Sequence, residues 1–176
     1  MLSRRKLLVG GAAIAVTGGI GLVVWSLPGE GGEEGRPEVR LGRDVCDRCG
    51  MVIADGRFAA AARLPNGKAW RFDDIGCLLN KLLPYERREE VRAWVASYPD
   101  ERWLEAATAW YVAASSLRTP MAFGVVALAT RAEAETEAAE VDGRVLSWSE
   151  LRAEWIPGEG LPGLEAARAV SERGWF

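Results

Sequence analysis

Two cysteines and a methionine, Cys46, Cys49 and Met51, lie within six consecutive residues and carry the chemistry that this sequence can perform. A Cys-x-x-Cys pair occurs in redox dithiols, in zinc sites built from thiolates, and in sites that bind soft metal ions. The chain has no histidine, which excludes imidazole bases and imidazole metal ligands. Any site must therefore be built from sulfur and oxygen donors.

The redox and zinc interpretations each need something that the sequence does not readily supply. A redox dithiol is expected at the start of a helix in a βαβ pattern, whereas Gly50 and a β-prone run follow the second cysteine here. A structural zinc site needs four ligands, and the only cysteines are Cys46, Cys49 and Cys77. An intrachain zinc site would have to include a carboxylate. Both interpretations stay open as alternatives.

The third interpretation is a Cu(I) site that uses methionine sulfur. In an extended segment, residues two apart point to the same face, and their backbone positions are about 6.6 Å apart. The flexible side chains of Cys49 and Met51 can therefore converge on one ion. Thiolate and thioether donors select Cu(I) over Mg, Ca, Mn or Zn. Met51 could equally fill a gap in the core. Met121, which follows Pro120, is the other methionine in a turn-like context.

The first 29 residues resemble a twin-arginine export signal. Arg4, Arg5 and Lys6 precede an uncharged segment, and as a helix residues 7–27 would span about 30 Å, the thickness of a bilayer core. No Ala-x-Ala site follows, so we expect an uncleaved membrane anchor with the domain on the extracytoplasmic, periplasmic face. Residues 30–38, rich in Gly, Glu and Pro, are expected to form a flexible tether.

Beyond the tether, the sequence predicts an α+β domain over residues 39–156. Asn66-Gly67 indicates a hairpin between strands 57–64 and 69–72, followed by a helix that Asp73 or Asp74 caps while the other acid stays solvated. The remaining expectations are strands at 91–97, 124–129 and 144–148, a helix at 132–140, a helix at 151–155 capped by Ser149, a strand or helix at 103–114, and a tail over 157–176 with a short helix at 164–173.

Residues 66–75 match residues 142–151 in residue class, from a turn and glycine to a strand, a cap and an acid. This similarity predicts two small related ββα-type modules, at about 46–83 and 119–155, packed together. Met51 and Met121 would then occupy equivalent turns that face each other across the contact between the two modules.

The net charge of −3, with Arg4, Arg5 and Lys6 outside the domain, leaves the domain acidic and argues against nucleic acid as a partner.

In combination, these motifs resemble the NosL family of copper chaperones, which deliver Cu(I) for the copper sulfide centre of nitrous oxide reductase. The resemblance runs from about Cys46 to Trp155. It is carried by four segments: Cys46-x-x-Cys49-Gly50-Met51, Phe72-Asp73-Asp74-Ile75-Gly76-Cys77, Trp103 with Ala106 and Ala107, and Thr119-Pro120-Met121.

The resemblance implies a fold of two related modules, Cu(I) as the bound metal, and Cys49, Met51 and Met121 as its ligands. Cys46 and Cys77 are further candidate ligands. The implied partner is nitrous oxide reductase or its maturation transporter complex, and no enzymatic activity is expected. Many family members carry an N-terminal lipid on cysteine, whereas this chain has the apolar segment in its place. A membrane-anchored thiol-disulfide oxidoreductase that uses Cys46 and Cys49 remains the alternative.

Overall fold

The computed structural model describes residues 35–164. The expected anchor, most of the tether and nearly all of the expected C-terminal helix lie outside the described residues. Within 35–164, no helix is long and apolar enough to cross a membrane. The described part is an α+β fold with antiparallel sheets, as the sequence predicts.

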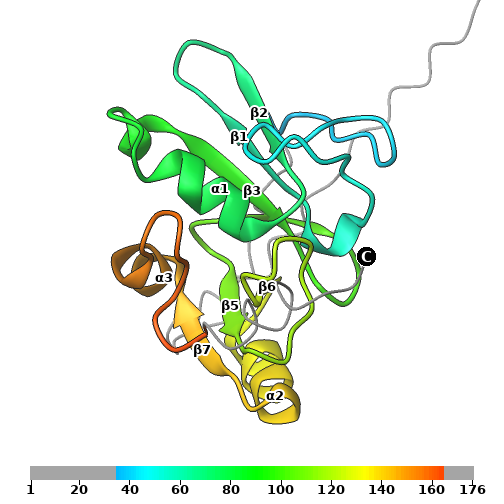
Figure 1. Ribbon diagram of the computed structural model, residues 1–176, viewed down its shortest axis with the longest axis vertical. Helices are drawn as coiled ribbons and strands as arrows, with labels where there is room; N and C mark the ends of the chain where they lie inside the picture. The colour runs from blue at the N-terminus through cyan, green and yellow to red at the C-terminus, as the bar shows by residue number, and fades with distance from the viewer. Residues whose placement is uncertain (1–34, 165–176) are drawn as a thin grey trace, which may run out of the picture.

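The first sheet has four antiparallel strands in the order β2-β1-β3-β4, and the helix α1 connects β2 to β3 (Figure 1). The apolar residues of α1 recur at helical spacing and are buried, among them Ile75, Leu78 and Leu82. They pack the helix against the first sheet, where α1 contacts β1 and β2. The elements are β1 (Ala60–Arg63), β2 (Ala69–Phe72), α1 (Ile75–Leu82), β3 (Arg92–Ala96) and β4 (Trp103–Glu105), with short 3-10 helices at Gly56–Phe58 and Arg88–Glu90.

The second sheet has three antiparallel strands in the order β6-β5-β7. Both sheets share one plan, in which the first strand is central, the second lies beside it, and a helix leads to the strand on its other side. The elements are β5 (Trp110–Ala113), β6 (Val125–Leu128), α2 (Arg131–Val141), β7 (Arg144–Ser147) and α3 (Trp148–Glu154). This plan pairs β2 with β6 and α1 with α2, whereas the sequence comparison paired β2 and α1 with β7 and α3.

Two local expectations need correction, and one open assignment is decided. The strand expected at 57–64 begins only at Ala60, because the Asp55 side chain accepts the Arg57 N–H and caps a 3-10 helix there. Helix α3 is capped by Ser147 in place of Ser149, because Ser147 forms a capping box with Glu150. The undecided segment 103–114 forms two short strands, β4 and β5, separated by a turn.

The two modules, one built on β1–β4 and the other on β5–β7, share a large hydrophobic cluster and several polar contacts, and a second cluster lies mainly in the second module. Tyr98 N–H donates to the carbonyl of Ala127 in β6 at 2.8 Å, which joins the two sheets. Asn80 on α1 accepts the indole N–H of Trp155 at 3.2 Å and the backbone N–H of Gly158 at 2.6 Å. Helix α1 therefore lies between the first sheet and the second module, contacting β6 as well as β1 and β2 (Figure 1).

The start of α1 is the tightest point of this interface. A Cβ on Gly76 would come within 2.2 Å of the Phe123 ring, so only glycine allows Phe123 to pack there. The fully buried Asp74 accepts the Gly76 N–H at 2.7 Å, which caps α1, and the Met121 N–H at 2.9 Å. One carboxylate therefore caps a helix of the first module and binds a turn of the second.

We expect Asp74→Ala to lower the free energy of unfolding by about 3 kcal/mol, since an N-cap is worth about 1 kcal/mol and a buried backbone donor without a partner costs about 1–3 kcal/mol more. The measurement is urea unfolding followed by tryptophan fluorescence. Asp55→Ala, which removes the partly exposed cap of the 3-10 helix, is the matched control and should cost less than about 1 kcal/mol. Equal losses in the two variants would contradict the bridging role of Asp74.

Candidate metal centre

Cys46 and Cys49 lie on a tight turn that the backbone itself closes. Gly50 N–H donates to the Cys46 carbonyl at 3.0 Å, and Cys46 N–H donates to the Met51 carbonyl at 2.7 Å. Gly50 has a φ of +79°, in the left-handed region that glycine adopts without strain. The closed turn leaves Cys49 near its tip and directs Cys46 into the core.

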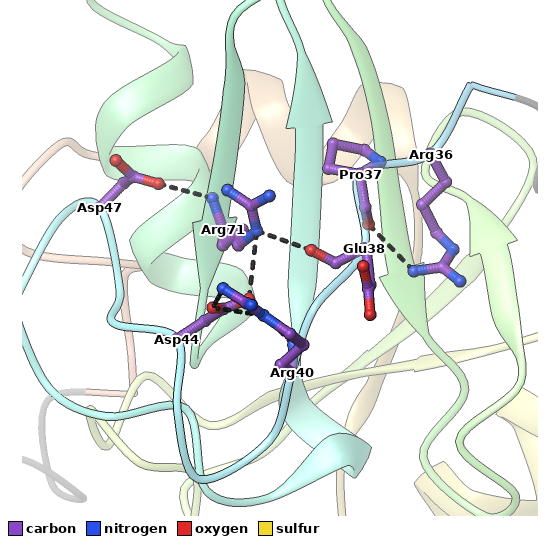
Figure 2. A network of polar contacts seen from close by, with 7 residues as sticks. All are labelled: Arg36, Pro37, Glu38, Arg40, Asp44, Asp47 and Arg71. Atoms are coloured by element: carbon purple, nitrogen blue, oxygen red, sulfur yellow. Dashed lines mark hydrogen bonds and ion pairs between the residues drawn. The ribbon is translucent and has the colours of Figure 1, made fainter.

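A network of charged residues fixes this turn against β2 (Figure 2). Arg71 on β2 donates from Nε to the Glu38 carbonyl at 2.6 Å and lies 3.3 Å from a carboxylate oxygen of Asp44, which also pairs with Arg40 at 2.7 Å. The Arg71 backbone exchanges two hydrogen bonds with Asp47, each 2.8 Å long. Because Asp47 directly follows Cys46, this network positions the first cysteine relative to the sheet.

The remaining donors come from the start of α1. Cys77 lies in the first turn of the helix, and Asp73 directly precedes the cap residue Asp74. The three cysteine sulfurs and an Asp73 carboxylate oxygen all lie within 4.8 Å of one another. Two sulfurs on opposite sides of an ion at about 2.3 Å are about 4.6 Å apart, so one ion can reach these donors after small movements. The structure thus places Cys77 beside Cys46 and Cys49, which lie far from it in the sequence.

Asp73 is the site residue that the sequence analysis missed. The expectation that one acid of the pair caps the helix and the other is solvated is wrong in its second half, because Asp73 is only 2% exposed and its oxygens lie 3.4 and 3.5 Å from Cys49 Sγ. Its position four residues before Cys77, at a helix start, was the available signal. Asp73 also supplies the carboxylate that a zinc site with three cysteines would need.

The charges of the cluster are set by burial and by hydrogen bonds between its members. A hydrogen bond from the Cys77 thiol lowers the pKa of Cys46 and raises that of Cys77. Burial raises the pKa of the Asp73 carboxyl to about 6, and burial also raises the pKa of Cys49. The buried Cys46 therefore has a lowered pKa, whereas the pKa of the more accessible Cys49 is raised. A dithiol catalyst needs the opposite arrangement, with an accessible thiolate.

The two candidate methionines lie in different surroundings. Met51 is 47% exposed, and its backbone N–H donates to the thiol of Cys49, two residues earlier. Met121 is half-buried and packs against the core that contains Cys46 and Cys77, and its backbone is bound to Asp74, the neighbour of Asp73. Their role as metal ligands stays a prediction.

A family model and a solved structure both match this chain. The NosL family model matches residues 40–156, which is more than half of the chain. A similar solved structure is that of the copper chaperone NosL from Shewanella denitrificans, with 21% identity, a TM-score of 0.54, and coverage of 65% of this chain and 96% of that one. At this identity the structural match shows the fold alone. Comparison with curated proteins gives no match. On the strength of the family match, this chain belongs to the NosL family.

Proposed function

We propose that this protein is a Cu(I) chaperone, held on the extracytoplasmic face of the membrane by residues 1–29, that delivers copper for the copper sulfide centre of nitrous oxide reductase. The observation that carries the proposal is the convergence of three cysteine sulfurs within 4.8 Å, with Cys49 half-buried at the surface of the cluster. Membership of the NosL family and the likeness to a protein described as a copper chaperone support it.

The donor set suits a soft monovalent ion. Sulfur donors favour Cu(I), and the proposed ligands are Cys49, Met51 and Met121, with Cys46 and Cys77 as further donors. The bound ion is the cargo of the protein and takes part in no reaction there. The site is closed by the core on one side and reaches solvent at Cys49 and Met51, so an acceptor can approach the ion from that side.

Transfer to an acceptor then proceeds by ligand exchange. A donor atom of the partner binds the ion on its solvent side while the buried cysteines still hold it, and the sulfurs of this chain are released afterwards. Asp73, whose oxygens lie 3.4 and 3.5 Å from Cys49 Sγ, can accept the proton that Cys49 loses when the ion binds and return it on release. The partner is nitrous oxide reductase or its maturation transporter complex.

Structural zinc is a second candidate, because Asp73 completes a four-donor set with the three cysteines. A closed Cys-rich tetrahedral set is typical of structural zinc. The thiol-disulfide oxidoreductase is the less favoured alternative, since the cysteine with the lowered pKa is the buried Cys46. Metal preference separates the chaperone from the zinc site, and reduction potential separates it from the oxidoreductase.

We expect the reduced protein to bind one Cu(I) and to prefer it strongly over Zn(II), because the donors are mainly soft sulfur. The measurement is an anaerobic titration against a chromophoric Cu(I) chelator, with a parallel Zn(II) titration against a zinc indicator. Replacing both Met51 and Met121 by Leu should weaken Cu(I) binding and leave the dithiol reduction potential unchanged. A Zn(II) affinity equal to or above the Cu(I) affinity would overturn the proposal in favour of a zinc site.

The anchor makes a separate prediction. Because residues 7–27 are uncharged and no cleavage site follows, the mature protein should keep its N-terminus and sediment with membranes. Intact mass of the protein extracted from membranes tests this. A mature chain that begins near Leu27 and stays in the soluble fraction would show that the segment is a cleaved signal.

A further inference from the structure

The sulfur donors are graded from solvent to core. Met51 is 47% exposed and Cys49 is half-buried, whereas Cys46 and Cys77 are only 3% and 1% exposed. Asp73, at 2%, lies with the two buried cysteines. Cys49 is therefore intermediate in exposure, and it contacts both ends of the series: its sulfur lies within 4.8 Å of the two buried sulfurs and accepts a hydrogen bond from the Met51 backbone.

The two buried cysteines are held more firmly than the exposed end of the cluster. Cys77 belongs to the first turn of α1, which Asp74 caps, and Cys46 is fixed by backbone bonds to Met51 and Gly50. Their side chains also share a hydrogen bond. Cys49 lies in the turn, outside any helix or strand, and is half-buried, so its side chain is the least constrained of the three cysteines.

We propose that Cu(I) occupies two overlapping positions in this chain, an outer one at Cys49 and Met51 and an inner one at Cys46, Cys49 and Cys77. Met121, which packs against the core that contains Cys46 and Cys77, is a further donor of the inner position. This inference rests on the proposed function, because it assigns the path of the same ion. The inner position holds the ion away from solvent, and the outer position is where an acceptor meets it. Cys49 is the ligand common to both positions.

Movement between the positions is ligand exchange without change of oxidation state. As the ion moves inward, its bond to the Met51 sulfur breaks and bonds to the Cys46 and Cys77 sulfurs form. Any thiol proton lost in this step passes to solvent by way of Asp73, which lies in the same cluster, and the copper remains Cu(I) throughout. Outward movement reverses each of these changes.

A site with two positions and a single site that uses all donors at once predict opposite effects of Met51→Leu on the rate of copper release. If all donors hold one ion together, loss of either an inner or an outer ligand loosens it, and both variants release copper faster. If the ion rests inside and leaves through the outer position, Cys77→Ser weakens the inner position and speeds release. Met51→Leu, in contrast, removes the exit ligand and slows release.

The test is extraction of Cu(I) from the loaded, full-length, detergent-solubilised protein by excess bathocuproine disulfonate under anaerobic conditions, followed by absorbance. We expect Cys77→Ser to release copper at least about tenfold faster than the unsubstituted protein, because loss of even a residue that only supports a metal ligand typically lowers metal affinity about 10–100-fold. Met51→Leu should release it more slowly. Faster release in both variants would overturn the two-position proposal and leave the chaperone function standing.

A measurement on the unsubstituted protein covers the case in which Cys77→Ser fails to fold. If the ion must first move outward, the extraction rate reaches a plateau as the chelator concentration rises, because the internal step becomes limiting. A rate that increases linearly over the whole range would show an ion already at the surface, and would overturn the proposal. If the unsubstituted protein binds no Cu(I), the proposed function itself fails.

Discussion

The structure depends on two adjacent buried carboxylates, Asp73 and Asp74, that face different parts of the molecule. Asp74 has extended backbone angles, φ −150° and ψ 141°, and successive side chains of an extended segment point to opposite sides. Asp73 consequently meets the cysteines, while Asp74 caps α1 and binds the backbone of Met121. Burial of both acids is tolerated because each has hydrogen-bond partners.

This arrangement links the metal centre to the contact between the modules. The cap fixes the first turn of α1, which carries Cys77, and the same carboxylate holds the turn that carries Met121. An ion that binds only the folded state shifts the folding equilibrium toward it. Cu(I) bound by residues of both modules would therefore also strengthen their contact, and release to an acceptor would remove that contribution.

The sequence predicted the parts of the fold that local chemistry determines. Asn66-Gly67 indicated the hairpin of β1 and β2, and the apolar spacing from Ile75 onward indicated α1 with its aspartate cap. The structure brings the candidate ligands Cys46, Cys49 and Cys77 together, and their role as ligands stays a prediction. The hairpin and the capped helix depend on neighbouring residues, whereas Cys77 was a candidate because of the family resemblance.

Features that depend on distant contacts were missed. Asp73 is buried because the Cys46–Cys49 turn folds over the start of α1. The residues next to Asp73 in the sequence do not distinguish a buried aspartate from a solvent-exposed one. The match between residues 66–75 and 142–151 paired β2 and α1 with β7 and α3. Any strand that leads from a turn into a capped helix has a similar residue pattern, so this match did not depend on the fold. The shared strand order of the sheets shows a different correspondence, which depends on long-range pairing.

The central claim is that the sulfur cluster is a Cu(I) site. Copper K-edge X-ray absorption of the full-length protein loaded anaerobically with one equivalent of Cu(I) examines the metal and its ligands together. The account predicts a Cu(I) edge and a first shell dominated by sulfur at about 2.3 Å, similar to metal–thiolate distances at other protein sites. A first shell dominated by nitrogen or oxygen, or copper that is lost on desalting, would contradict it.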